Sequence, residues 1–379
     1  MRWKGIWDLP IDLIDSFKNP EHIKALSFQI KKEAKRKLNI MEICGGHTHT
    51  IMKYGLTQLL PLQIEFVHGP GCPVCIMPKE RINEAIELAK QPNTILVTLG
   101  DMIRVPGSKT SLQDLRAEGY DIRALYSPLD TLKIAKENPD KTVIFFAIGF
   151  ETTTPMSAVL VEKVLQEGIK NILFHINHVL VPPSIHAIMK EGADIDAFLG
   201  PSHVSVITGY DIFTPITELY KTPVVVSGFE PSDVMESVLR IVRQFNEGRR
   251  EVENEYSRAV SKEGSIKAQK LIEKYFELRD SFRWRGLGDI PKSALKLKDE
   301  FAELDAEAVF ASKLSKKPVD DHKLCICADI LKGRAKPFEC KIFAKACTPK
   351  TPTGSCMVSS EGACAAYFKY GKFLRNQSE

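Results

Sequence analysis

A series of short apolar segments between residues 39 and 227 constrains the fold of this chain more than any other feature. They are rich in β-branched or aromatic residues, they end in glycine-containing or polar loops, and helical patterns usually follow them. The segments are NIMEI (39–43), QIEFVH (63–68), TILVTL (94–99), TVIFFAI (142–148), NILFHI (171–176), DAFL (196–199) and TPVVVS (222–227). Strands of this kind alternating with helices are typical of parallel sheets covered on both faces. We therefore expect an α/β fold with mainly parallel sheets.

The length of 379 residues exceeds what one ordinary core accommodates, so we expect several domains. An N-terminal helical segment is expected at 1–38, followed by two α/β domains at 39–135 and 136–231. Residues 232–379 would form a helical and cluster-binding domain. The tail, 321–379, has glycines, turn residues and cysteines but little continuous apolar pattern. A segment so poor in core-forming residues needs a cross-link to stabilise its fold, and a bound metal cluster would supply one.

Composition excludes several classes of protein. The chain is 44% hydrophobic and 26% charged, as expected of a globular protein. Its net charge is only +4 and no basic block stands out, so we expect no nucleic-acid partner. The longest strongly apolar stretch, 142–150, is far shorter than a membrane span, and MRWKGIWDLP has no signal-peptide pattern. A cytoplasmic protein without a membrane partner is therefore expected.

The loops that follow the expected strands carry most of the chemically useful residues. They read CGGHTH (44–49), GPGCPVC (69–75), GDMIR (100–104), GFETTT (149–154), NHV (177–179), GPSHV (200–204) and GFEP (228–231). In open α/β sheets, ligands bind beyond the carboxyl ends of the strands. We therefore expect these Cys, His, Glu and Thr residues to gather at that edge.

The nine cysteines fall into two groups. Three lie early in the chain, at Cys44, Cys72 and Cys75. The others lie in the tail, at Cys325, Cys327, Cys340, Cys347, Cys356 and Cys364. Since nothing indicates secretion, metal binding or redox chemistry is favoured over structural disulfides.

Part of the tail group has a spacing suited to a metal cluster. A C-x14-C-x6-C-x16-C frame contains Cys325, Cys340, Cys347 and Cys364. Four thiolates are the standard ligand set of a [4Fe–4S] cluster. A four-cysteine zinc site is the main competitor, but it usually has two close cysteine pairs, which this frame lacks. Because Cys327 and Cys356 lie nearby, spacing alone leaves zinc and free thiols open.

The early cysteines suggest two different kinds of chemistry. Cys72-Pro73-Val74-Cys75 is either a dithiol redox couple or half a metal site, with two inert buried cysteines as the alternative. A helix starting near Pro78 would point its N-terminus at this loop and lower the thiol pKa. Cys44 and His47 lie close enough in sequence to bind Fe, Zn or Ni in an open site. The alternative is that Thr48 or Thr50 merely caps the next helix.

Glu151 is a further candidate, in the loop Gly149 to Pro155. Thr154 suits the N-cap of the next helix and Pro155 its first position, so a capped helix start explains most of this motif. Glu151 is suited to donating or accepting a proton, or to orienting a ligand. Single histidines at strand ends are expected to be satisfied core or loop residues: His175, His178 and His203.

Together these motifs resemble the HypD family, maturation factors for the iron centre of [NiFe] hydrogenases. The resemblance runs from about Met41 to Tyr370 and rests on CGGHTH, GPGCPVC, GFETT, GPSHV and the tail pattern C-T-P-x-x-P-x-G-x-C-M-V-S-S-E-G-A-C. Any one of these motifs arises by chance, whereas all of them in this order hardly do. The chain departs from the family's usual C-x-C-G at Cys325-Ile326-Cys327-Ala328. Cys325 keeps the family's x14 spacing to Cys340, so we favour it over Cys327 as the ligand.

The resemblance implies a scaffold that holds an iron ion, together with the small chaperone HypC, while cyanide and carbon monoxide are attached. Cyanide would arrive from HypE as a protein thiocyanate. Cys44 would ligate the iron with a cysteine of HypC, with His47 nearby, and Cys72 and Cys75 would be the redox dithiol. The implied [4Fe–4S] ligands are Cys325, Cys340, Cys347 and Cys364.

The implied chemistry requires the two cysteine groups to communicate. Releasing cyanide from a thiocyanate while restoring the thiol consumes two electrons, which a dithiol stores and a [4Fe–4S] cluster passes singly. We therefore expect the tail to fold back so that the cluster lies near Cys72 and Cys75. A cluster-dependent thiol–disulfide oxidoreductase is the alternative, but it has no use for Cys44 and its histidines. A third alternative is an α/β binding module whose fold is stabilised by zinc. The expected protein is a redox-active assembly factor rather than a classical enzyme.

Overall fold

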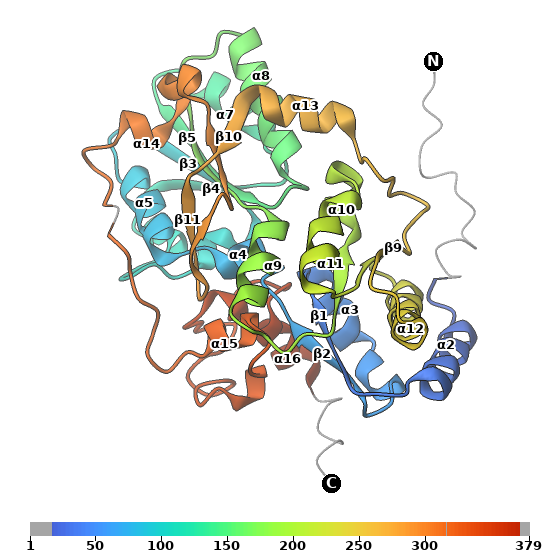
Figure 1. Ribbon diagram of the computed structural model, residues 1–379. Helices are drawn as coiled ribbons and strands as arrows, with labels where there is room; N and C mark the ends of the chain where they lie inside the picture. The colour runs from blue at the N-terminus through green and yellow to red at the C-terminus, as the bar shows by residue number, and fades with distance from the viewer. Residues whose placement is uncertain (1–16, 316, 372–379) are drawn as a thin grey trace.

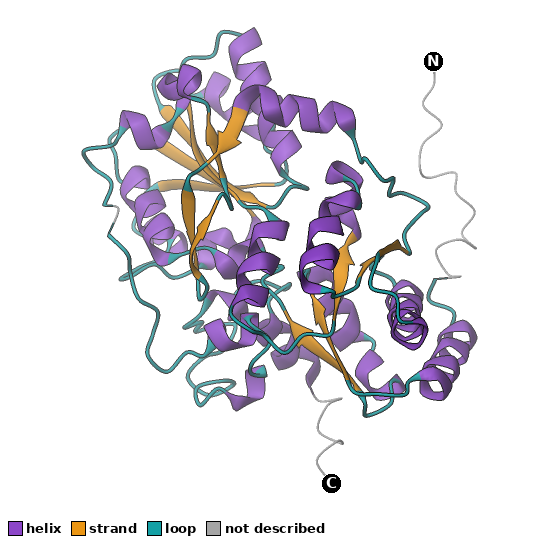
Figure 2. Cartoon of the chain, viewed as in Figure 1, coloured by secondary structure: helices purple, strands orange, loops and turns teal. Residues whose placement is uncertain are grey.

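The computed structural model describes residues 17–315 and 317–371 and contains two parallel sheets (Figures 1 and 2). The five-stranded sheet has the order β2-β1-β7-β8-β9, with β1 (Leu38–Glu42), β2 (Ile64–His68), β7 (Ala197–Pro201), β8 (Val224–Ser227) and β9 (Val252–Asn254). The four-stranded sheet has the order β4-β3-β5-β6, with β3 (Thr94–Leu99), β4 (Asp121–Leu125), β5 (Thr142–Gly149) and β6 (Ile172–His178). Every strand pair in both sheets is parallel, which confirms the predicted α/β class.

The predicted apolar segments all form strands, with ends within two residues of those expected. β4 and β9 were not predicted. Both lie at the edge of a sheet, where one side of the strand has no partner. Their side chains are partly exposed, so their sequences lack the continuous apolar pattern of the buried strands.

The strands are not grouped as a boundary at residue 135 would group them. The chain enters the five-stranded sheet with β1 and β2, builds the whole four-stranded sheet, and then returns with β7, β8 and β9. The five-stranded sheet therefore takes strands from three of the expected domains: β1 and β2 from 39–135, β7 and β8 from 136–231, and β9 from 232–379. Apolar patterns mark where strands lie, but they do not tell which strands pair.

The helices cover the sheets, and none in the described part of the chain is long and apolar enough to cross a membrane. They are α2 (Pro20–Glu33), α3 (Gly45–Lys53), α4 (Pro73–Ile76), α5 (Lys79–Ala89), α6 (Leu112–Ala117), α7 (Asp130–Glu137), α8 (Thr154–Gln166), α9 (Val181–Lys190), α10 (Ser202–Thr208), α11 (Thr214–Tyr220), α12 (Pro231–Glu247), α13 (Ile266–Tyr275), α14 (Ala306–Val309), α15 (Cys327–Leu331) and α16 (Ala363–Tyr370). Short 3₁₀ helices lie at Leu56–Leu59, Gly100–Arg104, Asp211–Phe213, Asp299–Leu304, Pro337–Glu339 and Ser355–Met357. Of the helical segment expected at 1–38, residues 1–16 lie outside the described residues.

Apolar packing joins the two sheets. The largest core contains side chains from both of them, among them Met41, Phe146 and Phe198. α2 and α12 pack together over one face of the five-stranded sheet, while α7 and α8 cover the four-stranded sheet. The sheets therefore share one core, and their carboxyl edges are fixed relative to each other.

The part of the chain after α12 is less helical than predicted. It contains two antiparallel ribbons, one of β10 (Phe276–Leu278) with β13 (Leu295–Leu297) and one of β11 (Ser281–Trp284) with β12 (Gly288–Pro291). Trp284 is fully buried and its ring centroid lies 6.0 Å from that of Phe150. The second ribbon is therefore anchored beside the loop that follows β5. In Figure 1 the red C-terminal segment lies below α4 and α9. Its helix α15 is near β2 and its helix α16 is near α3.

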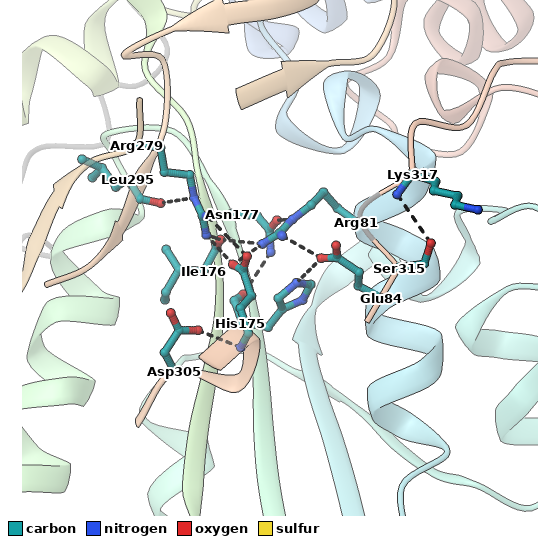
Figure 3. A network of polar contacts seen from close by, with 11 residues as sticks. Arg81, Glu84, His175, Ile176, Asn177, Arg279, Leu295, Asp305, Ser315 and Lys317 are labelled. Carbon is teal, nitrogen blue, oxygen red and sulfur yellow. Dashed lines mark hydrogen bonds and ion pairs between the residues drawn. The ribbon is translucent and has the colours of Figure 1, made fainter. Parts of the chain in front are cut away.

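Arg81 lies in a buried polar network that joins α5 to β6 and to the ribbons (Figure 3). Its Nη1 donates to Glu84 Oε2 and its Nη2 to Glu307 Oε1, both at 2.6 Å. Arg279 also bonds Glu307, and its Nη2 donates to the Ile176 carbonyl at 3.1 Å. Although burial alone would raise the pKa of the Glu307 carboxyl, Arg81 and Arg279 hold it far below its ordinary value. Glu307 therefore stays ionised and ties the ribbons to the four-stranded sheet.

We expect Glu307→Gln to lower the free energy of unfolding by about 3 kcal/mol, because it removes the carboxylate that bonds the largely buried Arg279 and one of the two carboxylates that bond Arg81. Urea denaturation at pH 7 measures this change. The same substitution at Glu303, which is exposed four residues earlier, is the control. It should change the free energy of unfolding by less than about 0.5 kcal/mol.

The stability should also depend on pH through Glu307. Its folded pKa lies below the unfolded value of about 4.3, so its stabilising contribution is complete above that pH and declines as the pH falls. Between about pH 5 and pH 3 the unmodified protein should therefore lose more stability than Glu307→Gln does. Parallel stability curves for the two proteins would contradict an ionised Glu307.

Candidate functional site

The loops after β1 and β2 meet in direct backbone contact. The Gly45 N–H donates to the Gly71 carbonyl at 3.2 Å. A Cβ on Gly71 would lie 2.2 Å from the backbone nitrogen of Cys44, so no other residue fits there. A Cβ on Gly46 would lie 2.8 Å from the ring of Phe229, in the loop after β8. The Cys44 loop and the CPVC loop therefore form one site at the carboxyl edge of the five-stranded sheet.

Cys44 caps the N-terminus of α3. Its Sγ accepts a hydrogen bond from the Gly46 N–H at 3.3 Å, and its own N–H donates to Glu42 Oε2 at 3.2 Å. The side chain is buried, and burial followed by the charge of Glu361 raises the pKa of the Cys44 thiol well above its ordinary value. A bound cation would replace the proton, because a metal ligates the thiolate.

His203, rather than His47, contacts the Cys44 sulfur. Both ring nitrogens of His203 lie 3.8 Å from Cys44 Sγ, and its ring stacks on Phe229 at 5.0 Å. The His47 ring also lies next to that of Phe229. Its Nε2 donates to the carbonyls of Ser227 and Gly228 at 3.2 and 3.0 Å. Burial lowers the pKa of each imidazole to about 4, so both are neutral and able to ligate a metal. His47 as a ligand remains a prediction.

His203 was predicted to be a satisfied core or loop residue, so its contact with the Cys44 sulfur was not predicted. The signal was the position of GPSHV at the same sheet edge as CGGHTH, since β7 pairs directly with β1. The other two histidines in that group do have partners: His175 Nε2 lies 3.0 Å from Glu84 Oε2, and His178 Nε2 lies 2.8 Å from Ser157 Oγ.

A buried polar chain connects the Cys44 loop to the tail. Glu42 Oε1 accepts from the Thr48 hydroxyl and lies 2.7 Å from His68 Nδ1. His68 Nε2 lies 3.1 Å from the Tyr367 hydroxyl, and burial followed by the Glu42 charge raises the pKa of that hydroxyl. Tyr367 lies one turn after Cys364 in α16. This series of hydrogen-bonded groups therefore fixes α16 relative to Cys44.

Cys72 and Cys75 flank the first turn of α4. Cys72 is its N-cap, and Cys72 Sγ accepts from the Cys75 N–H at 3.2 Å. The predicted lowering of the thiol pKa is wrong for Cys75, whose pKa burial raises well above the ordinary value. The helix predicted near Pro78 is present, since α5 begins at Lys79 with Pro78 as its N-cap, but Cys75 is completely buried. The tail covers it, because the Ser355 hydroxyl donates to the Cys75 carbonyl at 2.7 Å.

A row of thiols leads from this pair into the tail. After burial, the neighbouring thiols of Cys356 and Cys72 are the next causes that raise the pKa of Cys75. Cys356 contacts Cys327, and Cys327 contacts Cys325. Hydrogen bonds from the neighbouring thiols hold the pKa of Cys356 below its ordinary value. All five are free cysteines, and together they join the CPVC loop to the four-cysteine frame.

One cavity in the tail is lined by all the tail cysteines. They are Cys325, Cys327, Cys340, Cys347, Cys356 and Cys364. The rest of the lining is mostly apolar: Ile330, Ile342, Phe343, Gly354 and Met357. Within 17–315 and 317–371, no three His, Cys, Asp or Glu side chains are close enough together to hold a single metal ion.

The cavity suits a sulfur-ligated cluster. Thiolates are the ligands that iron–sulfur clusters require, and hydrogen bonds to sulfur tune them. Cys347 Sγ accepts such a bond from the Thr353 N–H at 3.3 Å. A Cβ on Gly354 would lie only 3.0 Å from Cys325 Sγ, so the glycine keeps space open beside that sulfur. The residues present therefore fit a [4Fe–4S] cluster.

Cys325 and Cys327 have different surroundings. Cys325 is partly exposed and lies against Gly354 on the cavity wall. Cys327 is buried at the start of α15 and contacts Cys356. This arrangement favours Cys325 as the cluster ligand, with Cys327 belonging to the thiol row.

Glu151 follows β5 and is buried. Its Oε1 accepts from the Val181 N–H at 2.9 Å, while its Oε2 is buried without a hydrogen-bond partner. Burial raises the pKa of its carboxyl to about 7, which suits a proton donor near neutral pH. In the described part of the chain no hydrogen bond joins Glu151 to a cysteine. α8 begins at Thr154 with Thr153 as N-cap, one residue earlier than predicted.

The chain matches known proteins over nearly its whole length. The HypD family, described as "Hydrogenase formation hypA family", matches residues 21–371. The hydrogenase maturation factor HypD of Azotobacter vinelandii is 50% identical over 368 residues, which cover 95% of this chain and 97% of that protein. Those of Cupriavidus necator and Escherichia coli are 46% and 41% identical; the alignments cover 95% and 94% of this chain, and 97% of each relative. The resemblance seen in the motifs is thus confirmed, and the chain belongs to the HypD family of hydrogenase maturation factors.

Proposed function

We propose that the protein is a cytoplasmic scaffold on which the iron centre of a [NiFe] hydrogenase receives its cyanide and carbon monoxide ligands. Its partners would be a HypC-type chaperone, which shares the iron, and a HypE-type carrier, which brings cyanide as a thiocyanate. The observation that carries the proposal is that the tail covers the CPVC loop: Ser355 bonds the Cys75 carbonyl at 2.7 Å, and the next residue, Cys356, lines the same cavity as the four-cysteine frame. It provides a route by which electrons reach the site where iron would be held.

Iron is the substrate that the Cys44 loop would hold. Cys44 supplies a thiolate and His203 a neutral imidazole, from loops that follow two paired strands. Both are types of ligand that iron accepts. Two protein ligands leave coordination positions open, as a site must if a chaperone cysteine and new ligands are to bind. His47, predicted as the ligand, would then orient the loop through its bonds to Ser227 and Gly228.

The dithiol would supply the electrons for cyanide release. Breaking the S–C bond of a thiocyanate takes up two electrons and returns the carrier's thiol. Cys72 and Cys75 give up those electrons and two protons as they form a disulfide, so one proton returns to the carrier sulfur and one accompanies cyanide. Glu151, with a pKa of about 7, is our proposed proton donor or acceptor. Cys325, Cys340, Cys347 and Cys364 would hold a [4Fe–4S] cluster, which would supply the single electrons that restore the dithiol.

The alternative is a cluster-dependent thiol–disulfide oxidoreductase that acts on other proteins. The thiol row alone is compatible with that function. The contact between Cys44 and His203 favours the scaffold, because a disulfide reductase does not require a second metal site. The following three experiments separate these functions.

Protein purified without oxygen should contain about four iron and four acid-labile sulfide per chain, since that is the content of one [4Fe–4S] cluster. Cys364→Ala should lose both, because it removes a ligand of the frame. Cys356→Ala is the control: it removes a cysteine of the same cavity that is outside the frame and should keep both. Zinc without sulfide would overturn the cluster and the electron-delivery role together.

Cys72→Ala should keep the cluster but fail to support hydrogenase maturation, because the remaining Cys75 cannot form the disulfide that releases two electrons. Hydrogenase activity of a strain carrying the variant is the measurement. Val74→Ala, between the two cysteines, serves as the control and should mature the enzyme normally. Normal hydrogenase activity with Cys72→Ala would rule out the dithiol role.

His203→Gln should weaken binding of the additional iron, that is, iron present without matching sulfide, by about tenfold or more. Iron and sulfide analysis after equilibration with limiting Fe²⁺ measures it. His47→Gln should have a smaller effect, because the His47 ring does not contact the Cys44 sulfur. His186→Gln, at an exposed position, is the control. Unchanged binding in His203→Gln together with loss in His47→Gln would restore His47 as the ligand.

A further inference from the structure

A pocket of about 280 Å³ lies beside the turn after β11, and none of the residues that line it has a part in the proposed function. Its charged lining residues are three cations, Lys79, Arg283 and Arg285, and two anions, Asp320 and Asp321. A water molecule occupies about 30 Å³ in the liquid, so the pocket has room for a small molecule together with a few waters. The excess of cations favours a ligand with negative charge.

Arg285 is the most deeply buried of the three cations. Its side chain is 2% exposed, against 13% for Lys79 and 32% for Arg283. Its Nε and Nη1 have no hydrogen-bond partner among residues 17–315 and 317–371. A buried guanidinium is costly unless its donors are bonded and its charge is compensated. These donors therefore favour a ligand that is negatively charged and accepts hydrogen bonds.

The pocket also adjoins the N-terminus of α5. Pro78, which is the N-cap, and Lys79, which is the first helical residue, both line the pocket. The first N–H groups of a helix have no partner within it, and no side chain caps this one. An uncapped helix N-terminus carries partial positive charge and attracts anions. The helix and the buried guanidinium are thus two independent features that favour the same kind of ligand.

A carboxylate of the chain itself lies against Arg285. Asp321 Oδ1 is 2.6 Å from Arg285 Nη2 and 3.8 Å from Lys79 Nζ. The pair does not have the alignment of a hydrogen bond, because neither Asp321 Oδ1 nor Arg285 Nη2 has a hydrogen-bond partner in the described part of the chain. The position of Asp321 shows that an oxyanion fits between these two cations.

The segment that carries Asp321 is weakly attached. Residues 317–321 contain no helix or strand, and they form no backbone–backbone hydrogen bond within the described residues. Lys79 Nζ donates to the Asp320 carbonyl at 3.2 Å, and Arg283 Nη2 lies 3.9 Å from Asp320 Oδ1. The Asp320 side chain is fully exposed and Arg283 also pairs with Glu80, so this ion pair is weak. Asp321 can therefore leave Arg285 without any regular structure being broken.

We propose that this pocket binds the oxyanion of a small molecule, a carboxylate or a phosphate group, on Arg285, Lys79 and the N-terminus of α5. Asp321 occupies the place of that group in the free protein and is displaced when the ligand binds. Binding exchanges one anion for another, so the affinity depends on how much better the ligand satisfies the buried donors than Asp321 does. The inference uses neither the thiols nor a metal, and it stands or falls separately from the proposed function.

Isothermal titration calorimetry of the purified full-length protein, carried out without oxygen, measures this binding. Inorganic phosphate and succinate are the two probes. Saturable binding of either probe at one site per chain is the expected result, and the probe that binds more tightly shows whether the site takes a phosphate or a carboxylate group. Absence of saturable binding with both probes would overturn the proposal.

Two substitutions should change the affinity in opposite directions. Asp321→Asn should bind the probe about tenfold more tightly, because it removes the internal carboxylate that competes for the same place. Arg285→Gln should bind it about tenfold more weakly or worse, because it removes the buried charged donors. Lys79→Gln, at a more exposed cation, should also weaken binding and replaces Arg285→Gln if that variant does not fold.

Asp121→Asn and Arg123→Gln are the matched controls. Arg123 bonds Asp121 through both Nε and Nη2 at 2.7 Å in another hollow of the surface, so its donors are already satisfied. These two variants change the net charge as Asp321→Asn and Arg285→Gln do, and both should leave the affinity unchanged. Weaker binding in Asp321→Asn would show that Asp321 supports the pocket rather than competes for it. That result, or equal changes in the controls, would contradict the proposed site.

Discussion

The contact between Gly71 and Cys44 is the constraint on which the site depends. A backbone atom of Cys44 occupies the space where a Cβ on Gly71 would lie. The backbones of the loops after β1 and β2 are therefore in direct contact. This approach brings the CPVC pair to the place where Cys44 and His203 would hold a metal. The CPVC cysteines and Cys44 thus share one edge of a sheet, although they lie 28 positions apart or more in sequence.

The tail completes that edge, and buried polar contacts help to hold it there. Ser355 bonds the Cys75 carbonyl, and Tyr367 ends the chain of polar groups that begins at Glu42. Such buried bonds are costly to break, because each leaves a polar group without a partner in a dry environment. The polar network around Arg81 acts in the same way for the ribbons that carry Arg285. Buried hydrogen bonds and ion pairs therefore add to the stabilisation that the tail obtains from its small apolar surface.

Much of this architecture follows from the sequence, and the parts that do not have physical reasons. Buried parallel strands have a strong local pattern, which is why β1, β3 and β5 were predicted almost to the residue. The interleaved sheets were not, since pairing between β1 and β7 depends on contacts far apart in the chain. The contact between His203 and Cys44 was not predicted for the same reason, since it depends on which strand lies beside β1. The tail frame was recognised by spacing, whereas the link through Cys327 and Cys356 became visible only when the chain was folded.

The order of strands also has a consequence for how the protein is made. β1 and β2 emerge first during synthesis, but their neighbour β7 follows only after the entire four-stranded sheet. The bonds that close the site join residues 280 and 299 positions apart, at Ser355 with Cys75 and at Tyr367 with His68. Contacts of such long range form late, after shorter-range structure has been built. On the ribosome, the early cysteines therefore stay exposed to solvent and oxidants until the tail has been translated, so synthesis of this protein would benefit from a reducing environment.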